Sequence, residues 1–197
     1  LIVMSQMREI RELSPADQRA VVDPGVINLQ VSKAAHPHGY YFAPDPSSQQ
    51  ICSIGGNVAE NSGGAHCLKY GFTTNGEQVQ LGTRAPDAPG YDLVGTVVGS
   101  EGTLGIVTSA TVRLVRLPEQ VRTMLAAFES TDAAGAATSA IIAAGIVPAA
   151  IEMMDELAIE AAEAAVQCGY PEGAGAVLVV EIDGPAAEVE HEFAAVE

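Results

Sequence analysis

The chain has 197 residues, of which 48% are hydrophobic, and its 25 acidic and 9 basic side chains give a formal net charge of −16. The apolar content is sufficient for a packed core, but so acidic a chain would be repelled by nucleic acid and by anionic lipid, so neither is an expected partner. No apolar run reaches the roughly 18 residues of a transmembrane helix. Three cysteines without metal-ligand spacing indicate reduced thiols and a cytoplasmic protein.

The charge is divided unevenly along the chain. Residues 1–122 hold 11 acids and all 9 bases, whereas residues 123–197 hold 14 acids and no Lys or Arg. This change predicts a domain boundary near Leu117-Pro118-Glu119, with domains over 1–118 and 119–197. The acids of the second part recur along predicted helices, which is typical of a solvated face rather than a binding site.

In the first domain, β-branched residues predict strands over 1–4 and 18–22, separated by a turn at Ser14-Pro15-Ala16-Asp17. Apolar residues at helical spacing predict a helix from Val26 towards Gly39. The prolines on either side of Asp45 favour an extended segment. Alternation of apolar and polar residues over 107–114 predicts a half-buried strand.

The second domain is predicted to alternate strands and helices. The strands cover 124–128, 151–154 and 176–182; the helices run from a Ser130-Thr131-Asp132 cap to Gly145, over 155–167 and over 185–196. In the middle helix the inward residues are expected to be Leu157, Ala161, Ala164 and Ala165. This order favours an α+β domain with helices on one face of a sheet.

The most informative stretch runs from Cys52 to Gly71 and contains two glycine pairs, Gly55-Gly56 and Gly63-Gly64. Glycine pairs permit positive φ and let the backbone lie against a ligand, and successive N–H groups suit phosphate oxygens. Asn57 and Asn61 add amide groups that can fix a ligand's polar edges. One such pair alone would be an ordinary loop; two pairs favour a cofactor cradle.

Several common motifs are absent from the sequence. It has no Gly-Lys-Ser/Thr of a P-loop, no G-x-G-x-x-G of a Rossmann turn and no G-x-S-x-G nucleophile elbow. His36 and His38 straddle Pro37 without an accompanying carboxylate or thiol, so no metal site is predicted there. His66 lies inside the cradle, where a ligand-binding and a structural role are equally compatible with the sequence.

The segments APDPSSQQ, CSIGGNVAENSGGAHCLKYG and GYDLVGTVVGSEGTLGIVTSATVRL together resemble the FAD-linked oxidases with a PCMH-type (vanillyl-alcohol-oxidase-like) flavin domain. Within that family the similarity is greatest to glycolate oxidase D subunits and to D-lactate and D-2-hydroxyglutarate dehydrogenases. PAAIEMMD and AVLVVEIDG resemble the family's substrate-side cap more weakly. The implied fold is α+β: part of a PCMH-type FAD-binding domain over 1–118, followed by the start of an α+β ferredoxin-like cap over 119–197.

The resemblance also implies which residues contact FAD. The flavin cleft would be lined by Pro44, Asp45 and Ser48, and the pyrophosphate would be met by Ser53, Gly55, Gly56 and Asn57. The isoalloxazine would lie near Asn61, Ser62 and Gly63, with His66, Tyr70 and Gly71 at its border. The ribose and adenine end would be met by Glu101, Gly102, Ile106 and Val107.

Other parts of the family pattern are expected outside this chain. These are an N-terminal lobe with an Arg-Gly-x-Gly-Thr loop, about a dozen residues between Asn75 and Gly76, and a His-x-Gly-Asp-Gly-Asn segment that supplies metal ligands and substrate contacts. The chain is therefore expected to be partial. No catalytic residue is assigned within it, and any divalent metal would be bound through residues outside it.

The function that the resemblance implies is oxidation of a small 2-hydroxy acid, glycolate or D-lactate, to the 2-keto acid, with hydride transfer to N5 of non-covalently bound FAD. Electrons would leave to a quinone or an electron-transfer subunit. Partners would be other oxidase subunits or a second copy, and the location cytoplasmic or peripheral to the inner face of a membrane. The alternative is a non-catalytic or vestigial flavin-binding subunit of a multi-subunit oxidase.

Overall fold

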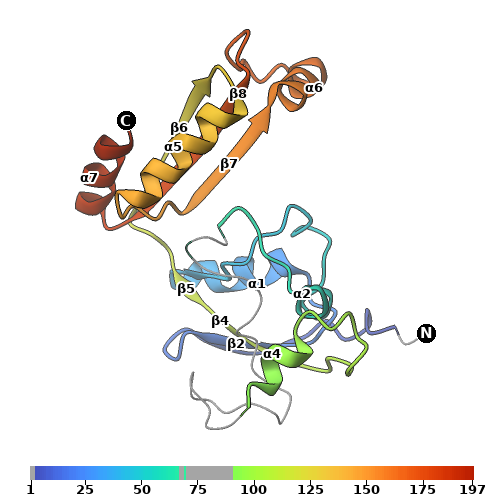
Figure 1. Ribbon diagram of the computed structural model, residues 1–197. Coiled ribbons are helices and arrows are strands. Elements are labelled where there is room, and N and C mark those ends of the chain that lie inside the picture. The colour runs from blue at the N-terminus through green and yellow to red at the C-terminus, as the bar shows by residue number, and fades with distance from the viewer. Residues whose placement is uncertain (1–2, 67–68, 70–90) are drawn as a thin grey trace. The chain divides into compact units, whose positions relative to one another are not determined.

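The computed structural model describes residues 3–66, 69 and 91–197 (Figure 1). The chain divides into two compact units, Leu1–Leu117 and Pro118–Glu197. The predicted contacts of Tyr70 and Gly71 lie outside the described residues. Among the described helices, none combines the length and the apolar character needed to cross a bilayer.

The first unit is built on an antiparallel sheet of three strands in the order β1-β2-β4: β1 (Ile10–Ser14), β2 (Arg19–Val22) and β4 (Ala110–Arg113). The turn at residues 15–18 joins β1 to β2, as predicted. The strand predicted over residues 1–4 is wrong for residues 3 and 4, which form no strand; β1 begins at Ile10 instead. The strand predicted over 107–114 is shorter in the structure, where β4 begins at Ala110 and ends at Arg113.

Helices and a second small sheet complete this unit. The helices within the described residues include α1 (Asn28–Ala35), a 3-10 turn at His36–His38, α2 (Ile54–Glu60) and α4 (Leu93–Val97). Strand β3 (Tyr40–Tyr41) pairs with β5 (Val115–Arg116). Gly39 ends the 3-10 turn with φ of 79°, a conformation that glycine adopts without steric cost. Helix α1 packs on the core through Val31, which is fully buried with Ile54 of α2 and Leu114.

The second unit is an antiparallel sheet in the order β6-β8-β7, formed by β6 (Gln120–Phe128), β8 (Ala176–Gly184) and β7 (Ala150–Asp155). Because β6 and β7 are both antiparallel to β8, they run parallel to each other. Helix α5 (Thr131–Ala143) connects them, and α7 (Ala186–Val196) follows β8. This is the split β-α-β arrangement of ferredoxin-like folds, as the family resemblance implied.

Local signals set the ends of these helices. The Ser130 side chain accepts a hydrogen bond from the Ala133 N–H, and Gly145 follows α5 with φ of 83°. Asp155 caps α6 (Glu156–Val166) by accepting from the Ala158 N–H. Such caps pair N–H groups that the first turn of a helix leaves without partners.

The predicted inward face of α6 is wrong. Leu157 is 73% exposed, and Ala161, Ala164 and Ala165 are also exposed, whereas Ile159 is buried. Because α6 begins at the residue directly after β7, the end of that strand determines which face of the helix packs on the sheet. Alanine is too small and too frequent in this helix for its spacing to define an apolar stripe.

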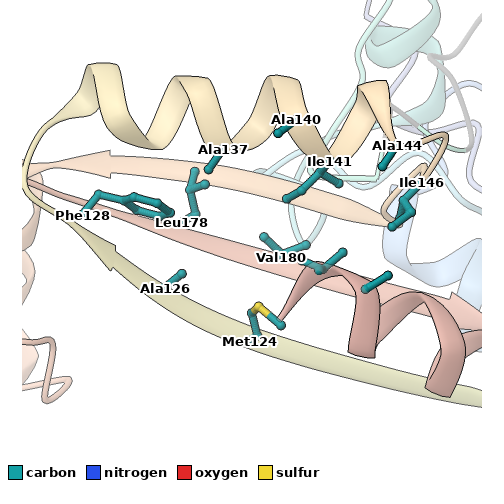
Figure 2. A pocket seen from close by; sticks show the side chains of 12 residues that line it. Met124, Ala126, Phe128, Ala137, Ala140, Ile141, Ala144, Ile146, Leu178 and Val180 are labelled. Atoms are coloured by element: carbon teal, nitrogen blue, oxygen red, sulfur yellow. The ribbon is translucent and has the colours of Figure 1, made fainter.

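The second core lies between the sheet and helices α5 and α7. Leu178, Val180 and Ile182 of β8 are buried there against Ala134 of α5 and Phe193 of α7. A pocket of about 250 Å³ lies beside α5. The side chains that line it, shown in Figure 2, are all apolar: Met124, Ala126, Phe128, Ala137, Ala140, Ile141, Ala144, Ile146, Leu178, Val180, Ala195 and Val196.

Candidate flavin site

The first glycine pair of the predicted cradle lies in a helix. Gly55 and Gly56 occupy the first turn of α2, and neither has a positive φ. A β-carbon at Gly55 would lie 2.7 Å from Cβ of Pro24, whereas at Gly56 it would meet Oγ of Ser53 alone, at 3.3 Å. Gly55 is therefore required for close packing rather than for a turn, and exposed Gly56 leaves open surface at the start of α2.

The polar groups of this turn form hydrogen bonds within the chain. The Gly55 N–H donates to the Pro24 carbonyl at 2.8 Å, and the Gly56 N–H donates to Oγ of Ser53 at 3.2 Å. Asn57 is buried, and its Nδ2 donates to Oδ1 of Asn28 at 2.7 Å. The donation from these residues to a pyrophosphate stays a prediction.

The second glycine pair lies against Asp45. A β-carbon on Gly64 would be 2.2 Å from Oδ1 of Asp45 and 2.4 Å from its carbonyl oxygen, so the two backbones touch. Nδ1 of His66 lies 2.5 Å from Oδ2 of Asp45, and the His66 N–H donates to Oδ1 at 3.3 Å. His66 and Asp45, both predicted site residues, are thus held together by a side-chain pair and a backbone bond.

The loop at residues 99–101 is attached to the C-terminal end of α2. The Gly99 N–H donates to the Val58 carbonyl at 2.8 Å, and the Glu101 N–H donates to the Ala59 carbonyl at 2.9 Å. Asn61 ends the helix with φ of 51°, and Glu101 has φ of 52°. Asn61 is therefore a left-handed helix end, a position at which asparagine is common.

The structure therefore brings together most of the predicted residues through α2. The Pro44 carbonyl accepts from Asn28 of α1, and Asp45 pairs with His66 of the 61–66 segment that follows α2. The Glu101 N–H donates to the last turn of α2. The Ser48 carbonyl accepts from the N–H groups of Ile51 and Cys52, in the turn that leads to α2. Gly102 and Ile106 are exposed, Val107 is half-buried, and no hydrogen bond in the described part of the chain joins these three to α2.

Two residues of this arrangement were not predicted as parts of the site. Asn28, 1% exposed, bonds to the Pro44 carbonyl as well as to Asn57, but in the sequence it reads as an ordinary helix-start residue. Gly64 was recognised as half of a glycine pair, but its contact with Asp45 joins residues distant in sequence. No group of three metal-ligating side chains occurs in the described ranges.

Comparison with known proteins defines the class. Residues 1–85 match the family model described as "FAD binding domain", and residues 117–197 match "FAD linked oxidases, C-terminal domain". The chain belongs to the FAD-linked oxidase family, as the sequence motifs indicated, and FAD is the cofactor of that family.

Among individual relatives, the glycolate oxidase subunit GlcD of Escherichia coli K12 is 49% identical over 98% of this chain and 41% of its own length. GlcD of Bacillus subtilis is 43% identical over 100% of the chain and 44% of its own length. The mitochondrial D-lactate dehydrogenase [cytochrome] of Arabidopsis thaliana is 31% identical over 81% of the chain and 30% of its own length. The chain thus spans about two fifths of the GlcD relatives.

A solved structure, that of an alkyldihydroxyacetonephosphate synthase, superposes with a TM-score of 0.82 over 98% of this chain and 39% of its own, at 20% identity. At that identity the likeness shows the fold alone. It is consistent with the two parts that the family models match, an FAD-binding domain and an FAD-linked-oxidase C-terminal domain.

The described residues fit a flavin cofactor. The N–H groups of Gly63 and Gly64 have no hydrogen-bond partner in the described part of the chain, and neither has the exposed side chain of Asn61. Free N–H groups on residues without β-carbons can approach phosphate or flavin oxygens directly, and an amide can both donate and accept. The apolar cavity beside α5 has no polar side chain in its lining and does not suit such a ligand.

Proposed function

We propose that this protein is an FAD-dependent dehydrogenase of a small 2-hydroxy acid, with glycolate and D-lactate as the first candidates. The observation that carries the proposal is a set of groups without a hydrogen-bond partner in the described residues, namely the Asn61 side chain and the N–H groups of Gly63 and Gly64, close to the Asp45–His66 pair. The names of the relatives, glycolate oxidase subunit and D-lactate dehydrogenase, supply the substrate class.

In this proposal the chain binds the FAD cofactor and orients it. The Gly63 and Gly64 N–H groups donate to cofactor oxygens, and Asn61 fixes a polar edge of the cofactor. FAD, when bound, would supply the acceptor for the hydride from the α-carbon of the substrate, and the hydroxyl proton would go to a base that is not assigned among the described residues. Asp45 accepts from Nδ1 and the N–H of His66, which sets the orientation of the imidazole ring at the border of this segment.

We further propose that the protein works with partners that reoxidise it. The GlcD relatives are named as subunits of a glycolate oxidase, which supports a multi-subunit assembly. We propose a quinone or an electron-transfer subunit as the electron acceptor. Two-electron oxidation of each substrate molecule requires such an acceptor for turnover.

The test uses the complete protein, purified and reconstituted with FAD. We expect a flavin absorption band near 450 nm that bleaches anaerobically on addition of glycolate or D-lactate, with L-lactate as the stereochemical control. Failure to retain FAD would refute the proposal. Retention of FAD without bleaching by any 2-hydroxy acid would refute the catalytic role and indicate a flavin-binding subunit.

A further inference from the structure

Two buried amide side chains lie beneath the candidate site. Asn28 and Asn57 are 1% and 2% exposed, and Nδ2 of Asn57 donates to Oδ1 of Asn28 at 2.7 Å. They lie in α1 and α2, within a core otherwise formed by apolar residues such as Val31 and Ile54. A buried amide is costly unless it is hydrogen-bonded, so this pair stabilises one relative position of the two helices.

The pair extends to the walls of the site. Nδ2 of Asn28 donates to the Pro44 carbonyl at 2.8 Å, and the Asn28 N–H donates to the Cys52 carbonyl at 3.0 Å. Pro44 precedes Asp45, which contacts Gly64 and pairs with His66. Asn28 therefore connects the Asp45 segment, the loop entering α2 and α2 itself.

We infer that Asn28, acting through Asn57, is a positioning residue for the flavin cofactor: it fixes the Asp45–His66 wall relative to the 61–64 segment that follows α2. The inference rests on the proposed function, because it assumes that FAD is bound by that segment. Both side chains are buried, so we assign them an effect that needs no contact with the cofactor. Their effect comes from hydrogen bonds whose direction allows a single register between three segments.

Ser32 offers a matched control in the same helix. Its Oγ donates to the Phe42 carbonyl at 3.2 Å and accepts from the Phe42 N–H at 3.0 Å. Asn28→Ala and Ser32→Ala each remove two side-chain hydrogen bonds: both bonds of Ser32 go to Phe42, whereas one bond of Asn28 goes to Pro44 and the other to Asn57. Asn28→Ala alone also breaks the link to α2.

The experiment measures FAD dissociation constants, urea stability of the apoprotein and visible circular dichroism of the saturated holoprotein. The complete protein and the variants Asn28→Ala, Asn57→Ala, Asn28→Ala/Asn57→Ala and Ser32→Ala are compared. We expect Asn28→Ala to raise the dissociation constant about tenfold and Ser32→Ala less than about twofold. Asn57→Ala should weaken FAD similarly, and the double variant little further, because the bonds belong to one chain.

The circular dichroism of bound flavin should change in the asparagine variants and stay unchanged in Ser32→Ala, since a stability effect alone would not alter the environment of a saturated cofactor. Equal weakening by Asn28→Ala and Ser32→Ala, in proportion to their lost stability, would overturn the inference. If Asn28→Ala does not fold, Asn57→Ala decides, because it leaves the bond to Pro44 intact. A wild-type protein that binds no FAD would refute the proposed function itself.

Discussion

Replacement of Gly64 by alanine tests the close contact between the second glycine pair and Asp45. The added β-carbon would lie 2.4 Å from the Asp45 carbonyl oxygen, whereas ordinary van der Waals contact begins at 3.4 Å. The two backbones must therefore separate by about 1 Å. Overpacking of this kind costs about 1–3 kcal/mol, and the same movement would pull Asp45 away from His66.

The matched control is Gly56→Ala, for which the new β-carbon meets only Oγ of Ser53, at 3.3 Å. Because Gly56 lies in α2, alanine there should be neutral or stabilising by up to about 1 kcal/mol. Urea unfolding of the apoprotein measures both changes. If Gly64→Ala is as stable as Gly56→Ala, the described contact between Gly64 and Asp45 is not present in solution and the reasoning is refuted.

Three further predictions concern separate features. Gly56→Val should leave the apoprotein folded but prevent FAD retention, because the branched side chain would occupy the predicted pyrophosphate path. Absorbance after gel filtration measures retention, and unchanged FAD affinity would show that the ligand lies elsewhere. Arg122→Ala should lower the free energy of unfolding in urea by about 1 kcal/mol, because the Arg122 guanidinium carbon lies 3.7 Å from the Phe193 ring centroid and its Nη1 lies 2.8 Å from Oε2 of Glu190. Arg122→Lys should recover only part of this loss; a full recovery would assign the effect to charge alone. Gly135→Ala in α5 should stabilise by about 0.5–1 kcal/mol, because a β-carbon there meets nothing within 4 Å; a lower melting temperature would contradict the open space.

Two elements whose signals lie in neighbouring residues were predicted correctly from the sequence. The Ser130 cap and Gly145 predicted α5, and the mostly apolar stretch 176–182 predicted the central strand β8. A cap bonds to the N–H three residues away, and a strand buried on both faces needs no polar alternation, so both signals are local. The glycine, asparagine and proline motifs indicated the FAD-linked oxidase family because several occur in the correct order.

Contacts between residues far apart in the sequence were decided only by the tertiary structure. Alanine spacing failed to find the buried side of α6, because the end of β7 determines how that helix packs. The sequence likewise suggested that glycines in the cradle serve tight turns, whereas Gly55 and Gly64 are required because Pro24 and Asp45 press against them. The burial of Asn28 beneath the site also could not be predicted from the sequence. A buried amide is tolerated only where hydrogen-bond partners lie beside it, and its partners here come from other segments of the chain.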